Sequence, residues 1–144
     1  MRITTWNINS VRLRIGLALK LLDQSRPDVL CLQETKCPDE QFPFEAFRDI
    51  GYKYIAVNGM KAYNGVALIS RVPFESELAL DWTERSDCRH ISGVFPGDIE
   101  IHNFYVPAGG DEPDIERNDK FATWILGEKR IFEYSRPLEG GTVY

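Results

Sequence analysis

The fold is decided by two stretches of the chain, Ile3-Thr4-Thr5-Trp6-Asn7 and Val29-Leu30-Cys31-Leu32. Residues 2–8 alternate and are rich in Ile, Thr and Trp, which predicts a strand. The second stretch is a continuous apolar run, as is typical of a strand buried on both faces. Between them, apolar residues recur at helical spacing after Ser10, the expected N-cap, and stop at Pro27; they are Val11, Ile15, Ala18, Leu19 and Leu22. This strand–helix–strand unit predicts two parallel strands.

The elements that follow complete the prediction of an α/β fold. A second helix is predicted over 43–50, opened by Pro43 and closed by Gly51. Further strands are predicted at 52–57, 64–71, 90–95 and 99–106. The last two flank a strong turn signal, Pro96-Gly97-Asp98, and should form an antiparallel hairpin. The segment 107–119 is rich in proline, glycine and acidic residues and predicts a loop.

The composition is that of an ordinary globular domain. The chain has 144 residues, is 43% hydrophobic and 27% charged, and carries a formal net charge of -5, which argues against a strongly basic nucleic-acid coat. No run approaches the ~20 apolar residues of a membrane span, and the N-terminus lacks the pattern of a signal peptide. Cys31, Cys37 and Cys88 form no CxxC motif, which favours free thiols in a reducing cytoplasm over disulfides or a zinc site.

Two polar residues follow the predicted parallel strands. The first strand ends at Asn7 and the second at Glu34. Because parallel strands bring their carboxyl ends to one sheet edge, where α/β proteins bind ligands, these side chains should lie together. A carboxylate and an amide suit Mg²⁺, which keeps several waters and shares its shell with substrate phosphate. Taken singly, Asn7 reads as a turn or helix-entry residue and Glu34 as a solvated strand end, and those readings stay open.

The hairpin supplies a second pair. With the turn centred on Gly97, Phe95 pairs near Ile99, and the same register sets Arg89 opposite Tyr105. Arginine is suited to bidentate phosphate contact, and tyrosine can donate a hydrogen bond to a phosphate oxygen. The alternative is an exposed arginine beside an ordinary strand tyrosine.

Five ordered motifs within residues 1–121 resemble those of the exodeoxyribonuclease III/AP endonuclease family, part of the endonuclease/exonuclease/phosphatase superfamily. They are Thr5-Trp6-Asn7-Ile8-Asn9-Ser10, Cys31-Leu32-Gln33-Glu34-Thr35-Lys36, Tyr63-Asn64-Gly65-Val66-Ala67-Leu68-Ile69-Ser70, Asp87-Cys88-Arg89-His90-Ile91 and His102-Asn103-Phe104-Tyr105-Val106-Pro107-Ala108-Gly109-Gly110. The LQETK and FYVPxG forms point to the DNA repair branch. The resemblance implies a four-layer α/β sandwich of mixed sheets flanked by helices, of which this chain would be the N-terminal half.

The resemblance also implies roles for individual residues. Glu34 would be the principal metal ligand and Asn7 its partner near the metal, with Mg²⁺ as the cofactor and Mn²⁺ as an alternative. Tyr105 would contact the scissile phosphate, so that it forms the catalytic set with those two residues. Arg89 would contact phosphate or the DNA backbone. Substrate binding would be supported by Asn9, Gln33 and Lys36.

The activity implied by the family is hydrolysis of the DNA backbone at abasic sites and from 3′ ends, as in base excision repair. The metal stabilises charge on the phosphate and on the leaving oxygen. The expected partner is double-stranded DNA with abasic sites or 3′ ends, in the bacterial cytoplasm at the nucleoid, without a membrane partner. Two alternatives stand beside this function. The chain could be another phosphodiesterase of the superfamily, acting on RNA, inositol phosphates or phospholipid heads, or a catalytically inactive fragment.

Two family motifs are absent from the sequence. The family's GDxN motif orients the attacking water and holds the phosphate, and its SDH motif completes the site. Here Gly97-Asp98 and Gly110-Asp111 are not followed by the required Asn, and neither His90 nor His102 follows a Ser-Asp pair. We therefore expect residues 1–123 to be the N-terminal half of the domain. Residues 124–144 would be a divergent tail left by truncation or a frameshift.

A half domain has a physical consequence. If one sheet of the sandwich lacks its partner, an apolar face and open strand edges are exposed, which predicts self-association through that face.

Overall fold

The computed structural model describes residues 1–75, 77–106, 108–111, 113–118 and 122. The chain divides into two compact units, Met1–Asp81 with Asp87–Tyr105, and Trp82–Ser86 with Val106–Tyr144. The predicted tail, 124–144, lies outside the described residues.

The first unit contains a four-stranded sheet that is built as the sequence predicts. Its strands are β1 (Ile3–Asn7), β2 (Val29–Gln33), β3 (Tyr54–Asn58) and β4 (Val66–Ser70), in the order β1-β2-β4-β3. The β1–β2 pair is parallel, with Asn7 opposite Gln33, and the other pairs are antiparallel. The prediction of parallel first strands in a mixed sheet is confirmed.

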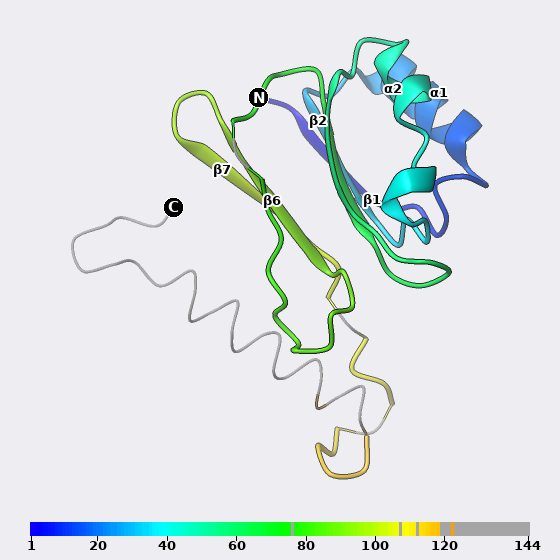
Figure 1. Ribbon diagram of the computed structural model, residues 1–144, viewed down its shortest axis with the longest axis vertical. Helices are drawn as coiled ribbons and strands as arrows, with labels where there is room; N and C mark the ends of the chain where they lie inside the picture. The colour runs from blue at the N-terminus through cyan, green and yellow to red at the C-terminus, as the bar shows by residue number, and fades with distance from the viewer. Residues whose placement is uncertain (76, 107, 112, 119–121, 123–144) are drawn as a thin grey trace. The chain divides into compact units, whose positions relative to one another are not determined.

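Helices cover one face of this sheet (Figure 1). They are α1 (Ile15–Ser25) and α2 (Phe44–Arg48), with a 3₁₀ turn, η1 (Asp39–Gln41), between them in sequence. Apolar residues from the helices and the sheet form one core between the layers; its fully buried members include Val11, Ala18, Leu22, Leu30, Leu32, Phe47 and Ile69. The apolar stripe of the first predicted helix therefore faces the sheet, as its spacing requires.

The start of α1 differs from the prediction. Ser10 is not the N-cap, because its φ is 87° whereas an N-cap needs extended backbone, and α1 begins only at Ile15 after Arg14. The Ser10 amide donates to the carbonyl of Glu34 at 2.8 Å, and the Val11 amide donates to that of Thr35 at 3.0 Å. Pairing with the loop after β2 holds this segment out of the helix.

A second sheet packs on the other face of the first. Its strands are β5 (Glu77–Leu78), β6 (His90–Phe95) and β7 (Ile99–Phe104), in that order. The β6–β7 hairpin has the predicted register, with Phe95 opposite Ile99. Its turn has positive φ at Gly97 and Asp98. The two-residue strand β5 was not predicted.

The expectation of an uncovered inner sheet face is wrong. Apolar side chains from both sheets form a second core between them, namely Val29, Cys31, Ala56, Val66, Leu68, Ile91, Phe95 and Ile101. The chain thus supplies strands to both sheets of a sandwich, because the segment after β4 crosses to the opposite layer. Self-association stays a prediction, and of its two expected causes, the uncovered face and the open strand edges, only the strand edges remain.

Two histidines form a hydrogen-bonded chain on β6 and β7. The Leu80 amide donates to His90 Nδ1 at 3.0 Å. The proton of the neutral ring therefore lies on Nε2, which donates to His102 Nδ1 at 2.9 Å. His102 Nε2 lies 3.1 Å from Glu100 Oε1. Burial, aided by His102, lowers the pKa of His90 from 6.5 to about 4. The His90 ring is fully buried, whereas the His102 side chain is 20% exposed, and a structural rather than catalytic role for the two histidines stays a prediction.

In the described part of the second unit, turns lie at 82–83 and 115–117. Asp114 Oδ1 accepts hydrogen bonds from the amides of Glu116 and Arg117 at 2.8 and 3.2 Å. Asn118 Nδ2 donates to the carbonyl of Gly109 at 2.9 Å.

The three cysteines are free thiols. Within the described ranges, the structure has no helix with the length and apolarity needed to cross a membrane.

Candidate functional site

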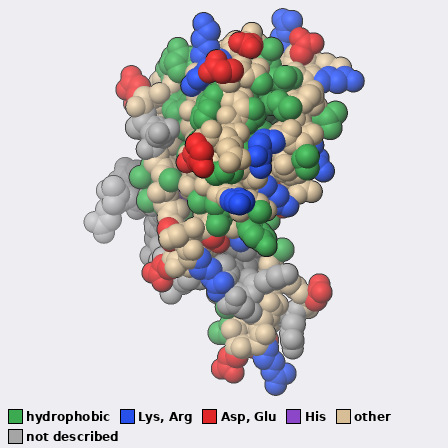
Figure 2. All heavy atoms as spheres, turned by 45° about the vertical axis from the view of Figure 1, so that its right-hand side comes forward, with side chains coloured by type: hydrophobic (Ala, Val, Ile, Leu, Met, Phe, Trp, Pro, Cys, Tyr) green, Lys and Arg blue, Asp and Glu red, His purple; other side chains and the backbone are tan. Residues whose placement is uncertain are grey.

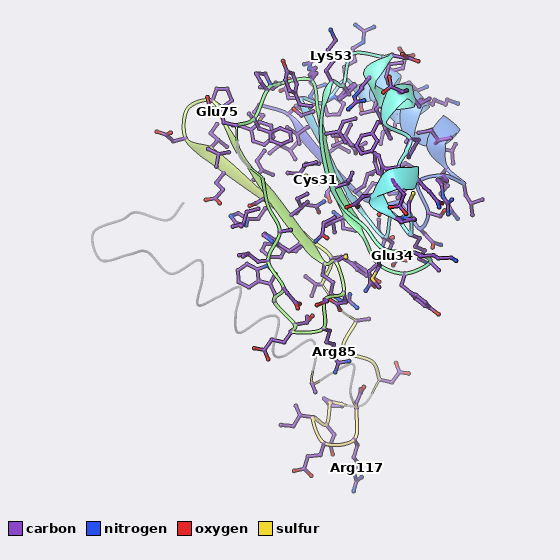
Figure 3. All side chains as sticks on the ribbon, in the orientation of Figure 1. Cys31, Glu34, Lys53, Glu75, Arg85 and Arg117 are labelled. Carbon is purple, nitrogen blue, oxygen red and sulfur yellow. The ribbon has the colours of Figure 1, made fainter. Side chains whose placement is uncertain are left out.

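The candidate site lies at the carboxyl ends of β1 and β2. Figure 3 shows Glu34 at one end of the sandwich, Lys53 and Glu75 at the other, and Cys31 between the sheets. β2 ends at Gln33, and Glu34 turns out of the sheet with a φ of 54°. This left-handed turn takes the Glu34 side chain away from the strand, which leaves it partly exposed, with 19% of the side chain accessible.

Glu34 is the centre of a polar cluster with Asn7, Lys36 and Tyr105, which we call the Glu34 cluster. Asn7 Nδ2 and the Tyr105 hydroxyl donate to Glu34 Oε1 at 2.8 and 2.9 Å. Lys36 Nζ lies 3.0 Å from Oε2 and also donates to Asn9 Oδ1 at 2.6 Å. The Asn7 hydrogen bond, followed by those of Lys36 and Tyr105, lowers the pKa of Glu34. The carboxylate is therefore held in its charged form.

Arg89 and Tyr105 lie together at the open end of the hairpin, as the predicted register requires. The Tyr105 amide donates to the Arg89 carbonyl at 2.8 Å. The Arg89 Cζ lies 4.8 Å from the centroid of the Tyr105 ring, and Nη1 donates to the Tyr105 carbonyl at 3.4 Å. Burial and the hydrogen bond to Glu34 raise the pKa of Tyr105. The phenol is thus a protonated donor aimed at the carboxylate.

A turn at Asn64-Gly65 joins the loops that carry Glu34 and Arg89. The carbonyls of Gly65 and Asn64 accept from the amides of Thr35 and Lys36 at 3.1 and 2.9 Å. On the other side, the Gly65 amide donates to the Cys88 carbonyl at 3.1 Å, and Asn64 Nδ2 donates to that of Asp87 at 2.8 Å. Gly65 has a φ of +88°, and a Cβ there would overlap Thr35 Oγ1. The turn therefore requires glycine at this position.

Asn103 joins the two sheets beneath the cluster. It extends from β7, is 2% exposed, and its Nδ2 donates to the carbonyls of Leu32 and Ala67, both at 2.9 Å. Gln33 Nε2 donates to Asn103 Oδ1 at 2.6 Å and to Thr5 Oγ1 at 2.9 Å. Leu32 lies two residues before Glu34, and Asn103 lies two residues before Tyr105. The hydrogen bond between Asn103 and Leu32 therefore helps to set the distance between Glu34 and Tyr105.

The oxygen donors of the cluster suit a divalent cation of the Mg²⁺ type. Glu34 offers a carboxylate, and Asn7 an amide whose Nδ2, rather than its oxygen, is turned toward Glu34; Mg²⁺ is bound in proteins by one or two carboxylates with waters and phosphate completing the shell. Across the described residues, no group of three or more His, Cys, Asp and Glu side chains is arranged to hold a metal by itself. The cluster therefore suits an ion that takes some of its ligands from the protein and the others from water and substrate phosphate.

The structure brings together all the residues that the sequence selected. Asn7, Glu34, Lys36 and Tyr105 are in direct contact, Asn9 is reached through Lys36, and Arg89 is reached through Tyr105. Gln33 supports the cluster through Asn103.

Three residues of the site were not singled out from the sequence: Asn64, Asp87 and Asn103. Asn103 is a polar residue within a strand-forming segment, and this could have indicated a structural role, because a buried polar group needs hydrogen-bond partners. The ion pair between Asp87 and Arg89 gave no periodic signal, because both residues precede the hairpin strand.

Comparison with known proteins shows several similarities. The sequence profile of the Endonuclease/Exonuclease/phosphatase family matches residues 4–137. Exodeoxyribonuclease III from Haemophilus influenzae is 37% identical over 125 residues, which covers 75% of this chain and 46% of that protein. An AP endonuclease structure from Archaeoglobus fulgidus gives a TM-score of 0.82 at 32% identity. The 3′ phosphatase NExo from Neisseria, bound to a product DNA hairpin, gives 0.81 at 31%. The two structural matches cover 93% of this chain and 50% and 51% of theirs, so the chain spans about half the length of these relatives.

Proposed function

Because the chain belongs to the endonuclease/exonuclease/phosphatase family, we propose that it carries part of the active site of an exodeoxyribonuclease III-type DNA repair nuclease. The reaction is divalent-metal-dependent hydrolysis of phosphodiester bonds in DNA. The observation that carries the proposal is the Glu34 cluster, in which Asn7, Lys36 and Tyr105 converge on one ionised carboxylate at a sheet edge.

Glu34, with Asn7 beside it, would hold the Mg²⁺ ion, and Mn²⁺ is the alternative. When bound, the ion supplies positive charge that stabilises the charge developing on the phosphate and the leaving oxygen. The carboxylate of Glu34 is kept ionised by its three hydrogen-bonding neighbours, which prepares it as a ligand near neutral pH.

The remaining residues of the cluster would face the scissile phosphate. Tyr105 is a protonated phenol that can donate to a phosphate oxygen, and Lys36 adds a cation 3.0 Å from Glu34. Arg89 holds a guanidinium against the Tyr105 ring, where it can reach a neighbouring phosphate. Asn9 positions the Lys36 ammonium.

The substrate we propose is double-stranded DNA with abasic sites or 3′ ends, as in base excision repair at the bacterial nucleoid. The Neisseria relative was solved with a DNA hairpin, and the Haemophilus relative is an exodeoxyribonuclease. Figure 2 shows lysine and arginine side chains interspersed with acidic ones on the displayed face. Together with the formal net charge of -5, this face favours phosphate contact through individual cations over a uniform basic coat.

A second candidate function is binding of metal and DNA without cleavage. The Glu34 cluster has a single carboxylate, and the sequence has no GDxN or SDH motif to orient an attacking water. A site with a phosphate contact but no base for water binds substrate without accelerating the reaction. We propose this behaviour for the 144-residue chain alone, and the nuclease reaction for the domain that its residues help to build.

Incubation with a duplex containing one abasic site tests both functions. Incision is measured on denaturing gels with Mg²⁺ and with EDTA, and binding is measured by fluorescence anisotropy with Ca²⁺. Glu34→Ala should abolish any metal-dependent incision and the metal-dependent part of binding. Glu75→Ala is the matched control, because this exposed glutamate lies at the opposite end of the sandwich (Figure 3).

Each outcome has a consequence. Metal-dependent incision that is lost in Glu34→Ala supports the nuclease function for this chain itself and refutes the binding-only candidate. Metal-dependent binding without incision supports the second candidate. Binding and incision that are both unchanged in Glu34→Ala would refute the proposed site.

A further inference from the structure

Asp87 and Arg89 form an ion pair next to the Glu34 cluster. Arg89 Nε donates to Asp87 Oδ2, and the two side chains are only 18% and 15% exposed. The same guanidinium donates through Nη1 to the Tyr105 carbonyl at 3.4 Å and lies over the Tyr105 ring. Asp87 and Tyr105 thus hold different atoms of one planar group.

The backbone of Asp87 is itself fixed. Its carbonyl accepts from Asn64 Nδ2 at 2.8 Å, and the next carbonyl, of Cys88, accepts from the Gly65 amide at 3.1 Å. Cys88 has a φ of 51°, which turns the chain between the two charged residues. The carboxylate therefore has a defined place relative to Glu34, because the Asn64-Gly65 turn also binds the backbone after Glu34.

We propose that Asp87 is a positioning residue, which holds the Arg89 guanidinium against the Tyr105 ring and thereby fixes the phosphate-facing side of the site. This inference rests on the proposed function. It adds a residue for which the family motifs supplied no role.

The physical reason is the freedom of an arginine side chain. An unpaired arginine has a long flexible stem and loses rotamer entropy when it is ordered. A carboxylate on Nε fixes the plane of the guanidinium, so its remaining N–H groups point in set directions before DNA arrives. Preorganisation of this kind improves binding by lowering the cost of ordering.

The substitution Asp87→Asn gives two opposite expectations. It removes one negative charge near the DNA, so electrostatics alone predicts tighter binding to a polyanion. The positioning role predicts weaker binding, by about tenfold, as for loss of one well-placed charged hydrogen bond. The measurement is the Kd for a fluorescein-labelled duplex with one tetrahydrofuran abasic site, by anisotropy in Ca²⁺.

Asp98→Asn is the matched control, because it makes the same charge change at the turn of the hairpin, which is the end away from Arg89. Asp98 has a φ of 58°, which asparagine also tolerates. Arg89→Ala gives the limit for loss of the guanidinium. Binding weakened in Asp87→Asn toward the Arg89→Ala value, with Asp98→Asn unchanged or tighter, supports the proposal. Equal or tighter binding in Asp87→Asn overturns it.

A second readout separates this inference from the proposed function. If the unmodified chain does not bind the duplex, the proposed function fails and the positioning role is judged by NMR. Aromatic ¹H–¹³C shifts of Tyr105 report the guanidinium over its ring. The same shift change in Asp87→Asn as in Arg89→Ala supports the positioning role. A Tyr105 signal that stays unchanged in Asp87→Asn, while Arg89→Ala moves it, overturns the role.

Discussion

Replacing Asn103 by leucine removes the polar link between the two sheets while it keeps the volume of the side chain. The amide makes three hydrogen bonds within the core, to the carbonyls of Leu32 and Ala67 and from Gln33 Nε2. These partners fix the orientation of the Asn103 amide, because the two carbonyl oxygens can accept hydrogen bonds only from its nitrogen.

The expected loss of stability follows from these contacts. Each carbonyl that stays buried without this donor costs about 1–3 kcal/mol. Burial of the leucine side chain returns roughly 2 kcal/mol. The net loss is therefore about 2 kcal/mol, which is a large fraction of the roughly 5–15 kcal/mol that stabilises a typical domain.

Asn103→Asp sharpens the test. One carboxylate oxygen would keep the hydrogen bond from Gln33 Nε2, but the other would face two carbonyl oxygens in the core, and a buried charge without a counter-ion costs about 3–5 kcal/mol. The aspartate variant should thus be less stable than the leucine variant at pH 7. The gap should narrow at lower pH, because a protonated carboxyl can donate one of the missing hydrogen bonds.

Urea unfolding followed by circular dichroism measures both effects. A loss of about 2 kcal/mol lowers the midpoint by roughly 1 M for a slope of about 2 kcal/mol/M. The reasoning is refuted if Asn103→Leu unfolds at the same midpoint as the unsubstituted chain, or if Asn103→Asp is the more stable variant at pH 7.

Three further predictions concern single sites. The lowered pKa of His90, from 6.5 to about 4, means that the unfolded chain takes up a proton first. The contribution of His90 to the free energy of unfolding is therefore fully present above pH 6.5 and is lost toward pH 4, by up to about 1.4 kcal/mol per pH unit. Denaturant titrations at several pH values should show a shallower pH dependence of stability in His90→Asn. Gly65→Ala should destabilise more than Gly97→Ala, because both glycines have positive φ but only the first would overlap a neighbour; paired thermal melts check the order. Burial raises the pKa of Cys31 to about 11, so mass spectrometry after brief iodoacetamide treatment should find Cys88, which is partly exposed, alkylated before Cys31. Labelling of Cys31 first would contradict its placement between the sheets.

Much of the fold could be predicted because its elements carry local signals. The continuous apolar run at β2 and the helical spacing before it specify a parallel pair, and that pair places Asn7 beside Glu34. The turn at Gly97 fixes the register that sets Arg89 beside Tyr105. In both cases a short-range rule determines a long-range contact.

The remaining features depend on tertiary contacts that no local pattern encodes. The crossing of the chain to a second layer after β4 depends on apolar faces finding each other, so the covered inner face was missed. Ser10 has the residue type of an N-cap, but its amide pairs with the Glu34 carbonyl instead. The role of Asn103 could not be assigned, because its partners Leu32 and Ala67 are distant in sequence.

The Asn64-Gly65 turn also limits how this site can vary over generations. Three of its four links to the loops of Glu34 and Arg89 use main-chain atoms alone. Substitutions of neighbouring side chains leave such links intact, whereas an inserted or deleted residue shifts every one of them. Related sequences that keep the site should therefore tolerate substitutions around this turn, other than at Gly65 and at Asn64, whose side chain makes the fourth link, far more readily than insertions or deletions.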